Sequence, residues 1–103
     1  MIKHYEYNIY CNKQGDLFKQ SGKHLKVDNR SKYPTVTFYN RGRKVTKSVH
    51  RLVAECYNGA PVETVHHCNH NTHDYRPANL ANVSRTTHNL IEVKGWQVES
   101  NLI

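Results

Sequence analysis

The sequence predicts an α+β fold, in which a small N-terminal antiparallel sheet is followed by a connecting helix and then by a strand–loop–strand–helix unit. Three observations support this prediction. Short β-prone runs separated by turn residues fill residues 1–48. An amphipathic run, Val49–Asn58, follows directly. Five of the eight histidines then fall within residues 64–90, a clustering that a hydrophobic core does not require.

The first half contains several short segments that are predicted as strands: residues 5–10, 17–20, 24–27, 33–39 and 44–48. The clearest alternation lies in residues 33–39, where Val36 and Phe38 face one side and Thr35, Thr37 and Tyr39 face the other. Turn residues at 12–16 and 40–42 connect neighbouring strands. We therefore expect one small antiparallel sheet in residues 1–48.

A helix is predicted over Val49–Asn58, because apolar residues recur on one face of this run. Ser48 can cap its first turn, and Gly59 with Pro61 beyond it is a regular stop signal. Cys56 lies on the apolar face and is predicted to be a buried, inert thiol.

The remaining chain reads as strand, loop, strand and helix, at residues 63–68, 69–76, 80–84 and 85–93. We expect a single domain over residues 1–103, with a basic sheet region at 1–48, a functional core at 49–95 and a short tail at 96–103. Cys68 is predicted to be a strand residue that faces the core. The loop histidines, His70 and His73, are predicted to be solvent-facing bystanders.

The net charge of +7 and the pI near 9.5 favour an acidic partner, and nucleic acid is the first candidate. The candidate contacts are Arg41, Arg43, Lys44, Lys47, Arg76 and Arg85. Three cysteines without a C-x-x-C pair indicate reduced thiols and a cytoplasmic protein. No signal peptide and no membrane-spanning segment is expected.

The histidine-rich segment suggests metal chemistry. Adjacent strand residues point to opposite sides, so His66 and His67 should have different roles unless the strand ends there. A strand ligand, His66, and a helix ligand, His88, would leave a metal ion with open positions, as a catalytic site needs. The Asn79 side chain can donate and accept hydrogen bonds, so it can hold the loop and thereby orient His67.

These motifs resemble the HNH endonuclease family, in particular the small phage and intron-type homing endonucleases with a ββα-metal site. The resemblance rests on V-H-R-L-V-A-E-C-Y at 49–57, V-H-H-C-N at 65–69, N-L-A-N-V-S at 79–84 and His88. Asn79 follows His67 by 12 positions, and His88 follows Asn79 by 9, as in that family. Many relatives have Asp before the base, where this chain has His66.

The resemblance implies a DNA endonuclease in which His67 is the general base, Asn79 the orienting residue, and His66 and His88 the metal ligands. It implies Mg²⁺ or Mn²⁺ for turnover, whereas histidine ligands would also suit Zn²⁺ or Ni²⁺. One such site cuts one strand at a time, so a nickase is expected, and double-strand cleavage would need a homodimer or a second event. A phage origin is implied by the same resemblance.

Three alternatives remain open from the sequence. Asn89 would replace His88 as the ligand if the helix were rotated by one residue. A non-catalytic zinc-stabilised DNA-binding module could use His66 and His88 together with loop ligands, namely Cys68, His70 or His73. An RNA-binding or RNA-cleaving domain could instead use the tyrosine-bearing sheet to stack single-stranded bases.

Overall fold

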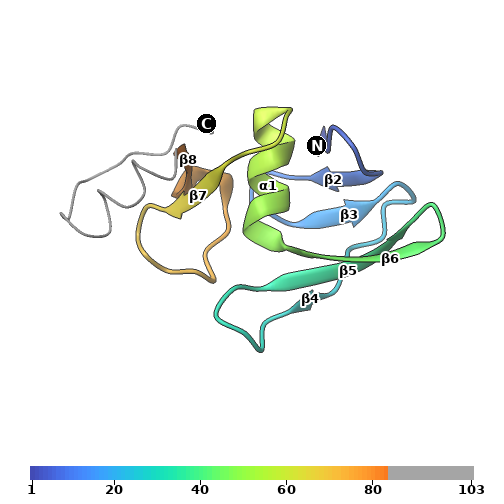
Figure 1. Cartoon of the computed structure of the whole chain (residues 1–103), viewed down its shortest axis with the longest axis horizontal. Helices are drawn as coiled ribbons and strands as arrows, with labels where there is room; N and C mark the ends of the chain where they lie inside the picture. The colour runs from blue at the N-terminus through green and yellow to red at the C-terminus, as the bar shows by residue number, and fades with distance from the viewer. Residues whose placement is uncertain (84–103) are drawn as a thin grey trace.

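The computed structural model describes residues 1–83, and Figure 1 shows helix α1 between the N-terminal strands and the β7–β8 hairpin. Residues 1–48 form two three-stranded antiparallel sheets. The first contains β1 (Ile2–Lys3), β2 (Ile9–Cys11) and β3 (Leu17–Lys19), in that order. The second contains β4 (Val27–Asp28), β5 (Thr35–Asn40) and β6 (Arg43–Ser48), in that order.

The prediction of antiparallel strands is confirmed, but the prediction of a single sheet is wrong. The segment expected as one strand, residues 24–27, changes partners halfway. The Leu25 N–H donates to the Leu17 carbonyl at 2.8 Å, whereas Val27 pairs with Val36 of β5. This change of partner carries the chain from the first sheet to the second.

The β5–β6 hairpin follows the predicted alternation. Val36 and Phe38 are buried, and Tyr39 is 74% exposed. A two-residue turn joins the strands, and both of its residues have positive φ: 52° at Arg41 and 78° at Gly42. Such turns match the twist of a tight hairpin.

Helix α1 spans Val49–Asn58, as predicted, and Gly59 ends it in the left-handed conformation at φ 73°. Leu52 and Val53 of this helix are completely buried, and Cys56 is buried as predicted. Burial raises the pKa of the Cys56 thiol to about 12, which keeps it protonated and inert.

The predicted cap of α1 by the Ser48 side chain is wrong. Ser48 makes no side-chain capping bond, because it is the last residue of β6 and pairs with Thr35. The first helical N–H instead donates across the fold, from Val49 to the Pro34 carbonyl at 2.9 Å. The start of the helix is therefore tied to the connection that precedes β5.

A buried polar pair attaches the N-terminus to α1. The Nε2 atom of His4 lies 2.9 Å from a carboxylate oxygen of Glu55, and His4 is 1% exposed. The Nδ1 atom of His4 accepts the backbone N–H groups of Glu6 and Tyr7, so Nε2 carries the proton and donates it to Glu55. The chain therefore bends around His4 where a strand had been predicted from residue 5.

The last described elements are β7 (Thr64–His67), a 3₁₀ turn (Pro77–Asn79) and β8 (Leu80–Val83). β7 and β8 are antiparallel, with His66 opposite Ala81 and His67 opposite Leu80. Cys68 lies beyond β7 and is half-buried, so its prediction as a core-facing strand residue is wrong. The predicted helix at 85–93, the tail at 96–103, and Arg85, His88 and Asn89 lie outside the described residues.

Within residues 1–83, no helix has the length and apolar character needed to cross a membrane.

Candidate functional site

His66 and His67 lie at the end of β7, where the strand gives way to the loop. Both are buried, with exposures of 3% and 6%. Because the strand ends at His67, the two side chains reach one pocket from different surroundings: His66 packs edge-on against His70, and His67 packs edge-on against His50. Adjacent strand residues were expected to share a site only if the strand ended there, and β7 does end at His67.

The pocket has a volume of about 370 Å³. It is lined by residues from β7, from the loop that follows it, and from the connection between β4 and β5: Lys32, Tyr33, Val65, His66, His67, His70 and Thr72. Among the described residues 1–83, no acidic side chain lines the pocket, so the charge of this lining favours an anionic group.

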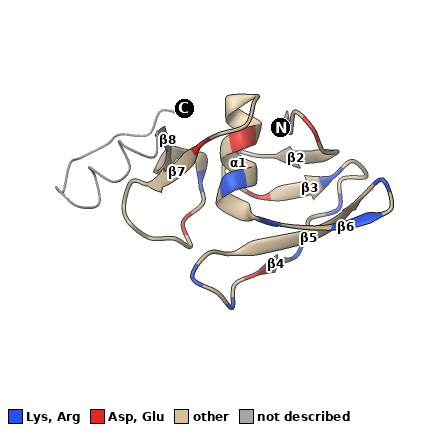
Figure 2. Ribbon diagram, in the orientation of Figure 1, with Lys and Arg blue, Asp and Glu red and all other residues tan. Residues whose placement is uncertain are grey.

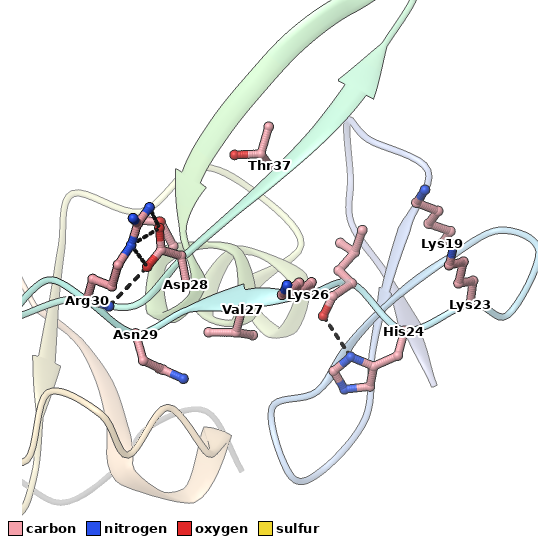
Figure 3. Close-up of a pocket in the computed structure, with 11 residues that line it drawn as sticks. Lys19, Lys23, His24, Lys26, Val27, Asp28, Asn29, Arg30 and Thr37 are labelled. Carbon is pink, nitrogen blue, oxygen red and sulfur yellow. Dashed lines mark hydrogen bonds and ion pairs between the residues drawn. The ribbon is translucent and has the colours of Figure 1, made fainter.

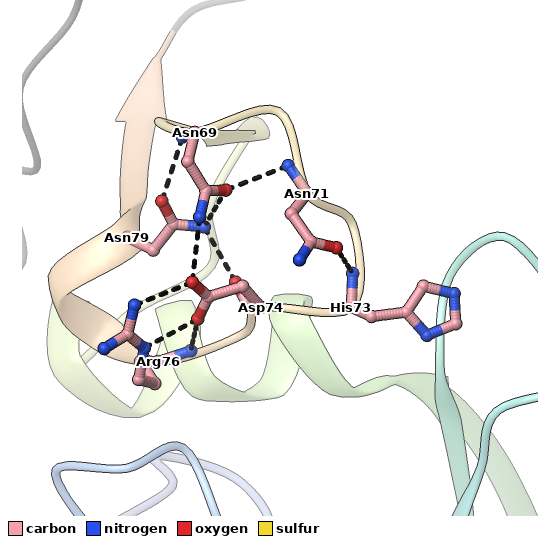
Figure 4. Close-up of polar contacts among 6 residues, drawn as sticks. All are labelled: Asn69, Asn71, His73, Asp74, Arg76 and Asn79. Carbon is pink, nitrogen blue, oxygen red and sulfur yellow. Dashed lines mark hydrogen bonds and ion pairs between the residues drawn. The ribbon is translucent and has the colours of Figure 1, made fainter.

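The loop after His67 is held by the side chain of Asn79 (Figure 4). Its Oδ1 accepts the backbone N–H of Asn69 at 2.9 Å, and its Nδ2 donates to the Asn69 side chain at 2.9 Å and to the Asp74 carbonyl at 2.8 Å. The Cys68 N–H also donates to the Asn79 carbonyl at 2.7 Å. Asn79 therefore fixes the chain immediately beyond His67, as its chemistry predicted.

Asp74 and Arg76 extend this network (Figure 4). The Arg76 guanidinium donates two hydrogen bonds of 2.8 Å to the Asp74 carboxylate, and Asn69 donates a third at 2.9 Å. These donors hold the pKa of Asp74 at about 2, chiefly through Arg76. Arg76, predicted to contact nucleic acid, thus has a structural partner in the loop, and its side chain remains 61% exposed.

His50, from the first turn of α1, packs behind His67. The His50 ring centroid lies 5.0 Å from that of His67 and 5.1 Å from that of Tyr33. Its Nδ1 atom is buried without a hydrogen-bond partner among the described residues. Burial, and then the proximity of His67, lower the pKa of His50 to about 4, so this ring is neutral near pH 7.

Of the two predicted metal ligands, His66 lines the pocket, whereas His88 lies outside the described residues 1–83. Within that part, no group of three histidine, cysteine or acidic side chains is placed to hold a metal ion. His66 has the His70 imidazole as a neighbour there, with ring centroids 5.2 Å apart. Two nitrogen donors suit a borderline transition metal better than Mg²⁺, which prefers oxygen. His73 points away from the loop network (Figure 4).

Figure 2 marks the lysine and arginine positions along the β5–β6 hairpin, and the strand register places their side chains on two faces. Lys44 is opposite Tyr39, on the exposed face with Thr37 and Thr46, whereas Arg43 and Lys47 alternate onto the other face. Arg41 lies in the turn.

A separate hollow of about 750 Å³ beside β4 adds further basic side chains (Figure 3). Its cationic lining residues are Lys19, Lys23, Lys26 and Arg30, of which Arg30 is paired with Asp28 at 2.7 Å. The basic character of the sheet region therefore extends over several strands.

Sequence reasoning missed the residues that other parts of the chain bring to the histidine pocket. Lys32 and Tyr33 precede β5, far from the histidines in sequence, and no local pattern identifies them. His50 belongs to the V-H-R-L-V-A motif, and its position there was the one available signal.

Comparisons with known proteins agree with this geometry. Residues 47–90 match the model of a family described as HNH endonuclease. The chain is also similar to a solved structure described as "DNA binding and cleavage by the HNH homing endonuclease I-HmuI", with 26% identity and a TM-score of 0.65. That similarity covers 91% of this chain and 57% of the other, so this chain spans little more than half of the other's length. No curated protein sequence gives a significant match.

The buried His50 predicts an acid-dependent loss of stability. As pH falls from about 6.5 to about 4, His50 becomes protonated in the unfolded chain but stays neutral in the folded chain. The free energy of unfolding therefore falls as the pH falls. We expect His50→Phe to reduce the difference in the free energy of unfolding between about pH 7 and about pH 4 by about 3 kcal/mol. Urea unfolding at about pH 7 and about pH 4 measures it. His73→Phe, at an exposed loop position, is the matched control. An unchanged pH dependence in His50→Phe would contradict the expectation.

Proposed function

Because residues 47–90 belong to the HNH endonuclease family, we propose that this chain is a metal-dependent DNA endonuclease in which His67 is the general base. The observation that carries this proposal is the juxtaposition of two buried histidines in a pocket without acidic lining residues, next to a loop held by Asn79. A phosphodiester is an anion that such a pocket accommodates.

His67 would take a proton from the water that attacks the phosphorus. A neutral imidazole can accept a proton near pH 7. The backbone of His67 is held by the loop turn, where the His70 N–H donates to the His67 carbonyl at 2.9 Å. Asn79 would act through the backbone at Asn69, as a positioning residue that keeps His67 in register with the substrate. The expected products are a 5′ phosphate and a 3′ hydroxyl.

A divalent metal ion would be held by His66 and by His88 or Asn89 of the following segment. When bound, the ion supplies Lewis-acid stabilisation of the charge that develops on the phosphate and the leaving oxygen. His66 supplies a nitrogen donor at the pocket wall, and His70 is close enough to His66 to restrict its ring. We propose Mg²⁺ or Mn²⁺ as the working ion, with Zn²⁺ and Ni²⁺ as the competing candidates.

The basic sheet region would hold the DNA backbone outside the pocket. The proposed contacts of this region are Arg41, Arg43, Lys44 and Lys47, and we propose Arg76 and Arg85 as further contacts beside the pocket. Support comes from the exposed polar face of β5 and β6, where Thr37, Thr46 and Lys44 surround the exposed Tyr39. Cleavage of one strand, as a nickase in the cytoplasm of the host cell, is the simplest mode for one site of this size; double-strand cleavage would require a homodimer or a second cleavage event.

Cleavage of supercoiled plasmid tests the proposal. We expect the wild-type chain to nick the plasmid with Mg²⁺ or Mn²⁺ and to lose activity with a chelator. His67→Ala should lower the rate by at least about 100-fold, because general base catalysis is lost. The control is His73→Ala, which changes an exposed histidine of the same loop and should keep the wild-type rate.

Equal nicking by the wild type and His67→Ala would exclude His67 as the base. A tightly held zinc ion, unfolding by chelator and no cleavage with any ion would instead support the zinc-stabilised binding module. Preference for single-stranded RNA would support the RNA-binding alternative.

The proposed DNA contact of Lys44 is tested by salt dependence. Each lost phosphate contact should reduce the slope of log affinity against log salt by about 1. We expect that change for Lys44→Ala and no change for Lys3→Ala, an exposed lysine of β1. The affinity for plasmid-length duplex DNA is measured against salt concentration in a fluorescence binding assay. A slope that is identical in Lys44→Ala and the wild type would remove Lys44 from the DNA interface.

A further inference from the structure

Two residues that line the histidine pocket come from outside the family-matched segment. Lys32 and Tyr33 belong to the connection between β4 and β5, and they line the pocket together with His66 and His67. Residues 47–90 alone would therefore leave one wall of the pocket missing. Lys32 brings a cationic side chain to the pocket that holds the histidines.

The backbone of this connection is bonded to the loop after β7 and to the start of α1. Before β5, the hydroxyl of Thr72 donates to the Lys32 carbonyl at 2.5 Å. Two residues later, the Pro34 carbonyl accepts the Val49 N–H at 2.9 Å, and Pro34 is buried. The Lys32 backbone is therefore placed by contacts from the loop and from α1.

The Lys32 ammonium is available to a ligand. It makes no ion pair with any residue among 1–83, and its Nζ atom lies 5.5 Å from the centroid of the Tyr33 ring. A cation over an aromatic face keeps its charge and is partly oriented by the ring. The Tyr33 ring, in turn, is tilted against His50 and lies 6.1 Å from His67.

The pocket has room for the reacting groups. A water molecule takes up roughly 30 Å³ of the liquid, so a pocket of about 370 Å³ accommodates a phosphodiester group and the attacking water. Within the described part of the chain, Lys32 is the only permanently charged side chain that lines it. During hydrolysis, negative charge grows on the phosphate oxygens, and an ammonium next to them stabilises that charge more than it stabilises the ground state.

We propose that Lys32 binds the phosphate group that is cut in the His66–His67 pocket. This inference rests on the proposed nuclease function and deepens it: the N-terminal sheet region completes the catalytic site, in addition to holding DNA beyond it. The phosphodiester contacts Lys32 through a nonbridging oxygen, while His67 handles the proton of the attacking water. No proton is transferred to or from Lys32.

Single-turnover nicking of supercoiled plasmid, with the full chain in saturating excess, tests this role. Lys32→Met removes the charge and keeps the stem that packs on Tyr33, whereas Lys32→Arg keeps the charge. Lys3→Met makes the same change at an exposed lysine of β1. We expect Lys32→Met to lower the saturated rate by about 100-fold, and Lys32→Arg to recover most of it. Plasmid affinity and the unfolding midpoint should stay close to those of Lys3→Met.

Three results would overturn the inference, and they can be told apart. If Lys32→Met nicks at the wild-type rate, Lys32 has no part in cleavage and the proposed function is untouched. If Lys32→Met weakens affinity alone, with an unchanged saturated rate, Lys32 holds DNA away from the phosphate that is cut. If the wild-type chain nicks with none of the ions tested, the proposed function fails, and this inference fails with it.

Discussion

The hydrogen bonds of the Asn79 side chain are the constraint on which the site depends. A single amide satisfies a backbone N–H, a side-chain oxygen and a backbone carbonyl across the loop. Asn79 itself is buried, and leaving its amide unsatisfied would cost about 1–3 kcal/mol. Asn79 thus converts a polar segment without regular structure into a fixed connection between β7 and β8, and it does so directly beside His67.

Helix α1 brings the rest of the chain to that connection. Its buried face forms the core, its first N–H is bonded to Pro34, and its Glu55 holds the N-terminus through His4. The two halves also pack closely where Gly15 meets Tyr75. A Cβ atom at position 15 would lie only 2.5 Å from the Tyr75 carbonyl oxygen, so this approach requires glycine. The sheet region and the histidine loop are therefore packed as one unit, which is why residues before β5 reach the pocket.

The elements with local signals could be predicted, and the long-range contacts could not. Val49–Asn58 has a regular apolar face and a glycine stop, and its predicted bounds agree with the structure. The loop-holding role of Asn79 followed from its amide chemistry and its spacing from His67. In contrast, the approach of Lys32 to the histidines and the pairing of His4 with Glu55 join distant segments, and nothing in either local sequence records the partner.

The central claim is that the histidine pocket is a metal-dependent catalytic site. Addition of Mn²⁺ to the full chain, followed by NMR of the imidazole groups, tests it most directly, because a paramagnetic ion broadens the signals of nearby nuclei. We expect substoichiometric Mn²⁺ to broaden the signals of His66, His67 and His70 and to leave those of His4 and His24 sharp. Equal broadening of all five signals, or none at the pocket, would contradict it.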